Sequence, residues 1–147
     1  MTERSVVVGR DGRAKAYRPL APEIRAAAVS AGLAAYERGD FFQAHEDLEP
    51  AWMGTADRSE RALLQGLIKV AAAYVHDVRG NPAGVARTLQ GARSLLDDAM
   101  VDGGPDLGHL PIDVAALIAA IDLRLADLSI HPEGPTLAPP DLRRSAR

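Results

Sequence analysis

The sequence contains no cysteine among its 147 residues. This absence excludes disulfide bonds, thiolate metal ligands and a cysteine nucleophile, and it leaves no sign of an oxidising compartment, so we expect a cytoplasmic protein. The sequence also lacks any run that approaches the roughly 20 apolar residues needed to cross a bilayer. We therefore expect no membrane as a partner.

A strong charge of one sign is also missing. The formal net charge is −3, which is too small to create a basic field that gathers nucleic acid. Residues 1–21 are locally basic, but their basic side chains are not regularly interleaved with aromatic ones, as nucleic-acid contacts usually require. We interpret this segment as an irregular basic arm, with a small hairpin as the alternative, and we do not expect nucleic acid as a partner.

The remaining composition is typical of a globular helical protein. Hydrophobic residues make up 47% of the chain and charged residues 25%. Apolar residues recur at helical spacing in successive segments, and no strand–helix–strand alternation interrupts them. We predict a single all-α domain over residues 22–128, built as a compact array of about five helices, followed by a proline-rich tail over residues 129–147.

Start and stop signals define the helices. Proline at a first helical position and aspartate or asparagine at a cap position mark the starts, and glycine marks several of the ends. The predicted helices run from Pro22 to Gly39, from Asp40 to about Gly54, from Asp57 to about Arg79, from Pro82 to a loop over residues 102–110, and from Pro111 to Leu128. The third is apolar on nearly all sides and is therefore expected at the centre. Pro50 predicts a kink or an early end in the second helix.

The second predicted helix carries an unusual concentration of functional side chains. His45 and Glu49 are four residues apart and share one face, and Trp52 follows on that face one turn later. The third predicted helix places Gln65, Lys69 and His76 on one stripe of an otherwise apolar surface. Since buried polar groups need partners, we expect the two helices to turn these side chains toward each other around a small polar pocket.

The residue types in this pocket suggest a metal or a small polar ligand. Imidazole and carboxylate together suit zinc, iron or manganese, and we predict His45, Glu49 and His76 as ligands of such a divalent ion. If the protein is an enzyme, metal-assisted hydrolysis is the favoured reaction class, with Glu46 or Glu49 as the base toward a bound water. The residues expected to contact a small ligand are Trp52, Gln65 and Lys69.

A noncatalytic helical module is the competing hypothesis. In that case the polar cluster only fixes the packing of two helices, and Trp52 is a core anchor. Function would then reside in an exposed face or in the proline-rich tail, with another protein or a second copy of the chain as partner. Metal content separates the two hypotheses, because only the first predicts bound metal that a His45→Ala substitution removes.

The segment 39–52, Gly-Asp-Phe-Phe-Gln-Ala-His-Glu-Asp-Leu-Glu-Pro-Ala-Trp, resembles the signature of a bacterial and archaeal family, domain of unknown function 309. The family pattern is H-x-x-x-E-x-x-W, and His45, Glu49 and Trp52 match it. Residues 60–68, 71–76 and 80–82 also look like this family, so the similarity covers roughly residues 30–100. The resemblance implies a compact all-α array and a metal-binding role for the His and Glu of the motif.

Overall fold

Capping side chains set the boundaries of the helices in the computed structural model, which describes residues 6–8, 14–103 and 110–144. Asp40 accepts a hydrogen bond from the main-chain N–H of Gln43, and Asp57 accepts one from that of Glu60. The helices are α1 (Pro22–Glu37), α2 (Phe41–Met53), α3 (Arg58–Val78), α4 (Pro82–Gly103) and α5 (Val114–Ile130). The predicted all-α array is thus confirmed.

A small antiparallel hairpin precedes the helices. Its strands are β1 (Val6–Val8) and β2 (Ala14–Ala16), with Val7 paired to Lys15. Of the two interpretations of the N-terminal segment, the structure has the hairpin. Further along, Arg18 donates a main-chain hydrogen bond to the carbonyl of Met53, so the segment that follows β2 is joined to the end of α2.

The start of α5 and the course of α2 differ from the sequence prediction. α5 begins at Val114 and not at Pro111, because Asp113 caps it by accepting a hydrogen bond from the N–H of Ala116 at 3.1 Å. In α2 the helix continues through Pro50 to Met53, so the early end that proline allowed is not observed. This continuation keeps the whole functional face of α2 on one helix.

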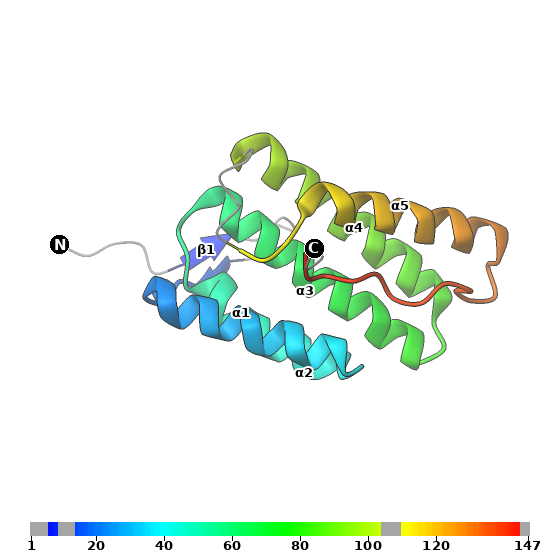
Figure 1. Cartoon of the computed structure of the whole chain (residues 1–147), viewed down its shortest axis with the longest axis horizontal. Helices are drawn as coiled ribbons and strands as arrows, with labels where there is room; N and C mark the ends of the chain where they lie inside the picture. The colour runs from blue at the N-terminus through cyan, green and yellow to red at the C-terminus, as the bar shows by residue number, and fades with distance from the viewer. Residues whose placement is uncertain (1–5, 9–13, 104–109, 145–147) are drawn as a thin grey trace.

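The central helix is α3, as predicted. It packs against α2 on one side and α4 on the other, while α1 covers α2 and α5 covers α4 (Figure 1). The contact with α4 is close at Gly66, where a Cβ atom would lie only 2.8 Å from the side chain of Leu96. Glycine at this position therefore lets the two helices approach, and fully buried leucines fill the core around them.

The proline-rich tail packs against the helices over its described length. Residues 131–144, called the strap from here on, run without helix or strand beside α5 and back toward α1 (Figure 1). Tyr36 of α1 donates its hydroxyl to the carbonyl of Pro140 at 2.7 Å, and Leu142 is only 2% exposed. The strap therefore completes the core between α1 and α5. None of the helices in the described part of the chain is long and apolar enough to span a membrane.

Candidate functional site

A cavity of about 180 Å³ opens between α2, α3 and α4, and we call it the α2–α3–α4 cavity. Side chains from all three helices line it: His45, Glu49, Trp52, Gln65, Ile68, Lys69, Ala72 and Thr88. Five of the residues singled out in the sequence therefore lie around one space. An isoleucine, an alanine and the indole ring supply its apolar surface, and the other five residues supply polar groups.

On the α2 side of the cavity, the imidazole of His45 has a nitrogen without a hydrogen-bond partner in the described structure. His45 stacks on the exposed ring of Phe42 with an interplanar angle of 9°. Its Nδ1 atom is buried and has no hydrogen-bond partner among the described residues. The nearest carboxylate oxygen, on Glu46, is 3.5 Å away, which is too long for a hydrogen bond and is an ion pair only if the ring is protonated. Nδ1 therefore remains available to a bound group.

The same wall holds a second unmet nitrogen, on the indole of Trp52. This residue is 4% exposed, and its Nε1 atom is buried without a hydrogen-bond partner in the part of the chain that the structure describes. Buried indole N–H groups usually find an acceptor, because leaving a buried donor unpaired costs about 1–3 kcal/mol. The indole therefore has an unsatisfied donor beside the cavity. Glu49 already takes part in an interaction of its own.

The α3 wall is formed by Gln65 and Lys69, both half-buried. The aliphatic stem of Lys69 lies over Gly91 of α4, where a Cβ atom would sit 3.4 Å from Cδ and 3.7 Å from Cε. This contact directs the side chain along α4. Among the described residues, no carboxylate lies within the 4.0 Å that defines an ion pair with Lys69. Lys69 therefore has no ion-pair partner among the described residues, although the carboxylate of Glu49 lines the same cavity.

The sequence analysis missed Thr88, which supplies the α4 wall. The signal was present, because Thr88 is three residues after Val85 and four before Ala92, both fully buried. This spacing puts its hydroxyl on the inward stripe of the helix. A polar residue on such a stripe is a candidate for the same reason as Lys69 on α3.

Two predicted site residues lie elsewhere. His76 does not line the cavity: its Nδ1 is 3.2 Å from the side-chain amide of Asn81, at the connection between α3 and α4. It is two helical turns beyond Lys69, a rise of about 10 Å along the helix. Glu46 is half-exposed and also does not line the cavity, since it follows His45 by one residue and points to another side of α2.

The predicted set of metal ligands is therefore not assembled. Within residues 6–8, 14–103 and 110–144, no three His, Asp or Glu side chains are placed to hold a metal ion. His45 and Glu49 are the two candidate donors that share the cavity. Protein-held metal sites usually have three or four protein ligands, so these residues do not by themselves fit a resident ion.

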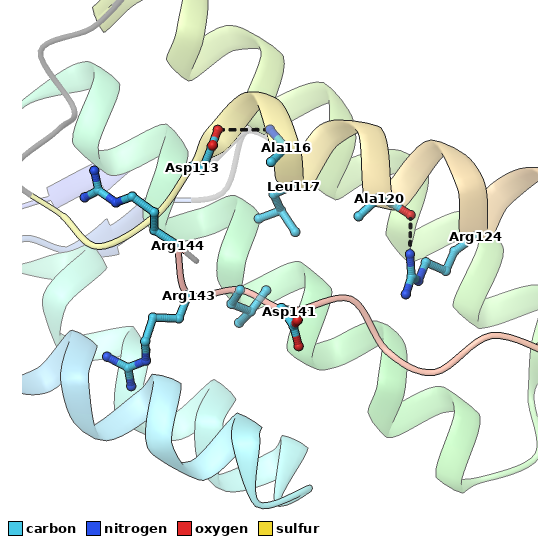
Figure 2. A pocket seen from close by; sticks show the side chains of 9 residues that line it. Asp113, Ala116, Leu117, Ala120, Arg124, Asp141, Arg143 and Arg144 are labelled. Atoms are coloured by element: carbon cyan, nitrogen blue, oxygen red, sulfur yellow. Dashed lines mark hydrogen bonds between the residues drawn. The ribbon is translucent and has the colours of Figure 1, made fainter. Parts of the chain in front are cut away.

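A larger cavity, of about 360 Å³, lies between α5 and the strap (Figure 2). We call it the strap-side cavity, and it was not predicted from the sequence. Its lining residues are Asp113, Ala116, Leu117, Ala120, Arg124, Asp141, Leu142, Arg143 and Arg144. Its three arginines would suit an anionic ligand if they had no partners within the protein. Their hydrogen bonds therefore show whether this cavity is a binding site.

The arginines of the strap-side cavity already have partners. Arg143 donates two hydrogen bonds to Glu37, at 2.8 and 3.2 Å. Arg124 donates to main-chain carbonyls of the strap at 3.0 Å and of α5 at 3.1 Å, the second of which is drawn in Figure 2. Arg144 donates to the main chain before α5 at 2.7 Å. These groups hold the strap in place and are not vacant binding groups.

The pKa values of nearby groups also show which side chains are bonded to the strap. Hydrogen bonds from the side chain and main chain of Thr136 hold the pKa of Asp127 below its ordinary value, so this carboxylate also secures the strap. Burial raises the pKa of Tyr74 to about 12 and raises that of Tyr36 above its ordinary value. The hydroxyl of Tyr36 is bonded to the strap, whereas that of Tyr74 is buried without a partner in the described structure.

Comparison with known proteins locates the α2–α3–α4 cavity within a family domain. Residues 29–88 match the family model described as domain of unknown function (DUF309). No curated protein and no solved structure matches the chain. The matched segment contains every residue that lines the α2–α3–α4 cavity, whereas the residues of the strap-side cavity lie outside it. Residues 29–88 of the chain are therefore similar to the DUF309 family.

Proposed function

We propose that this protein binds a small polar ligand in the α2–α3–α4 cavity. The observation that supports the proposal is that polar side chains from three helices converge on one space, and that two of its lining residues, His45 and Trp52, each have a buried nitrogen without a partner in the described structure. Buried polar groups in folded proteins are nearly always hydrogen-bonded, and exceptions often indicate a bound partner or a functional group. A bound ligand supplies such a partner.

The size of the cavity restricts the ligand. Its volume of about 180 Å³ is similar to the roughly 150 Å³ of an engineered protein cavity that holds benzene. The buried part of the ligand is therefore a group of only a few heavy atoms. Its apolar side would contact Ile68 and Ala72, while its polar atoms would face Gln65 and Thr88.

Binding of a divalent metal is a second candidate function. It is favoured by the presence of His45 and Glu49 in the same cavity, because imidazole and carboxylate are donors that suit zinc, iron or manganese. Since the protein supplies two donors there, water or a bound ligand would have to complete the coordination. A hydrolytic activity would draw on Glu49, the carboxylate that lines the cavity, as its base.

The architectural alternative makes a different prediction for the same residues. If the cluster only fixes helix packing, the chain is a noncatalytic module, and its cavity binds neither ligand nor metal. Replacing His45 would then change thermal stability and nothing else. The three readings can be separated with one labelled protein, because Trp52 is the single tryptophan of the chain and its indole N–H gives one unambiguous NMR signal.

The test is a titration of ¹⁵N-labelled protein with small polar molecules, in groups that are anionic, neutral or cationic. We expect at least one group to shift the Trp52 indole signal saturably, and His45→Ala to weaken that binding. His131→Ala, the same substitution in the strap, is the control and should leave binding unchanged. Metal content of untagged protein, measured before and after His45→Ala, tests the second candidate. An indole signal that no group moves would contradict ligand binding.

A further inference from the structure

We infer that the ligand of the α2–α3–α4 cavity is a small oxyanion, a molecule that presents a carboxylate or phosphate group to Lys69 and Trp52. This inference rests on the proposed function and adds the chemical class of the ligand. It follows from the hydrogen-bonding capacity of the lining side chains, from the missing counter-ion of the lysine and from the apolar surroundings of both groups.

The cavity has more donors than acceptors. The indole N–H of Trp52 and the ammonium of Lys69 can only donate, whereas Gln65 and Thr88 can donate and accept. Glu49 is the one lining side chain that only accepts when ionised, and it already takes part in another interaction. A ligand that completes the hydrogen bonding must therefore bring acceptors. A carboxylate brings two acceptor oxygens and no donor, and a phosphate group brings mainly acceptors.

Lys69 differs from two arginines that form ion pairs elsewhere in the fold. Arg25 is paired with Glu60 at 3.1 Å, and Arg143 is paired with Glu37 at 2.8 Å. Lys69 has no such partner in the described part of the chain, although it is half-buried. Since a partly desolvated ammonium is stabilised by a nearby anion, the unpaired ammonium of Lys69 favours a ligand of negative charge.

The surroundings strengthen this preference. Ile68, Ala72 and the ring of Trp52 form an apolar wall of the cavity, and a charge-assisted hydrogen bond is stronger beside such a wall than in open solvent. In the strap-side cavity, each arginine already donates to Glu37 or to a main-chain carbonyl, and two aspartates line the same space. The oxyanion inference therefore concerns the α2–α3–α4 cavity.

The experiment compares three probes of nearly equal size at constant ionic strength: acetate, acetamide and ethylammonium. Each is titrated into the ¹⁵N-labelled full chain while the Trp52 indole signal is followed. We expect acetate to bind at least tenfold more tightly than acetamide and to move the signal downfield, with ethylammonium weakest. Inorganic phosphate, titrated in the same way, distinguishes a phosphate-bearing from a carboxylate-bearing ligand.

Variants identify the group responsible. Lys69→Gln should reduce acetate affinity at least tenfold and leave acetamide affinity unchanged. Arg38→Gln makes the same change of charge at an exposed position that does not line the cavity, and it should preserve acetate binding. Thr88→Val, which removes a hydroxyl and keeps the shape, is a second cavity variant with less risk of misfolding. Thermal melts confirm that each variant is folded.

The outcomes separate the inference from the proposed function. If acetamide or ethylammonium binds as tightly as acetate, the cavity is a ligand site but the oxyanion inference is wrong. If acetate binds better but Lys69→Gln and Arg38→Gln weaken it equally, the preference comes from overall charge and the inference is also wrong. If none of the probes, phosphate included, moves the indole signal, both the inference and the proposed function fail.

Discussion

The strap-side cavity and the α2–α3–α4 cavity differ in a way that their sizes do not show. The strap-side cavity has about twice the volume of the α2–α3–α4 cavity and three arginines, yet each arginine is bonded to Glu37 or to a main-chain carbonyl. The smaller cavity is lined by His45 and Trp52, each of which has a buried nitrogen without a partner in the described structure. Unsatisfied polar groups, more than volume, therefore indicate where a ligand binds.

The difference also teaches what each region contributes. On the strap side, polar groups of α1 and α5 bind the strap, which is a segment of the same chain, and these bonds stabilise the fold. In the α2–α3–α4 cavity, by contrast, His45 and Trp52 each have a buried nitrogen without a partner in the described structure. Substitutions on the strap side should therefore lower stability, and substitutions in the smaller cavity should mainly lower binding.

Removal of the buried leucine of the strap should have the largest effect. Leu142 is 2% exposed, and Leu142→Ala should lower the free energy of unfolding by about 2–4 kcal/mol, because it removes buried methyl groups and leaves a cavity. Leu137→Ala, at a strap residue that is 40% exposed, is the control and should change stability by less than about 0.5 kcal/mol. Urea denaturation measures both. Equal effects would show that the strap is not part of the core.

Two buried tyrosines give the next comparison. Tyr36→Phe should cost about 1–2 kcal/mol, because it leaves the buried carbonyl of Pro140 without its donor. Tyr74→Phe should be neutral or stabilising, because its buried hydroxyl has no partner to lose. Both substitutions remove one oxygen, so shape and volume are matched. A larger loss from Tyr74→Phe than from Tyr36→Phe would contradict this assignment of hydrogen bonds.

The attachment of the strap should weaken in acid. The pKa of Asp127 is lowered in the folded state by Thr136, so its contribution to stability is present above the unfolded pKa, about 3.9, and is lost as pH falls through the lower folded value. We expect wild type to exceed Asp127→Asn in stability at pH 6 and the gap to narrow below about pH 4. Denaturation of both proteins across this range is the measurement. A gap that widens in acid would have the wrong sign.

The ion pair between Glu37 and Arg143 should have the smallest effect. Both side chains are nearly half-exposed, at 45% and 40%, so solvent and salt screen their attraction. A double-mutant cycle with Glu37→Gln and Arg143→Gln should give a coupling of about 0.2–1 kcal/mol that declines in 1 M salt. A coupling above about 2 kcal/mol would show that this pair, and not Leu142, is the main anchor of the strap.

Much of the helical fold could be predicted from local chemistry. Asp40, Asp57 and Gly39 specify helix ends through side-chain hydrogen bonds and a left-handed backbone conformation, and the structure has the boundaries near where they indicate. The start of α5 was misplaced because Pro111 and Asp113 are competing start signals. The aspartate determined the start, because its side chain satisfies an N–H of the first turn.

The candidate site was only partly predictable from the sequence. Helical spacing shows which face of its helix a residue lies on, but not its level, that is, its height along the axis of the helix bundle. Consecutive helices joined by a short connection are usually antiparallel, so the level of His45 on α3 is near residue 66, or about one turn from Lys69. His76 shares the stripe of Lys69 but lies beyond the start of α2. Allowance for this level would have excluded His76 as a partner of His45.

The strap could not be predicted from periodicity. Its contacts join residues about 100 positions apart, such as Tyr36 with Pro140, and proline-rich segments carry no pattern of spacing that reports burial. The strap has two leucines, Leu137 and Leu142, and nothing in their spacing shows that the second is packed and the first exposed. Tertiary contacts thus decided the structure of this region.

One NMR spectrum compares the two cavities directly. In ¹⁵N-labelled full chain saturated with acetate, the Trp52 indole signal reports on the α2–α3–α4 cavity, and the Nε–H signals of Arg124 and Arg143 report on the strap side. We predict that the indole signal moves downfield and that both arginine signals stay in place. Movement of the arginine signals with a stationary indole would contradict the assignment of ligand binding to the smaller cavity.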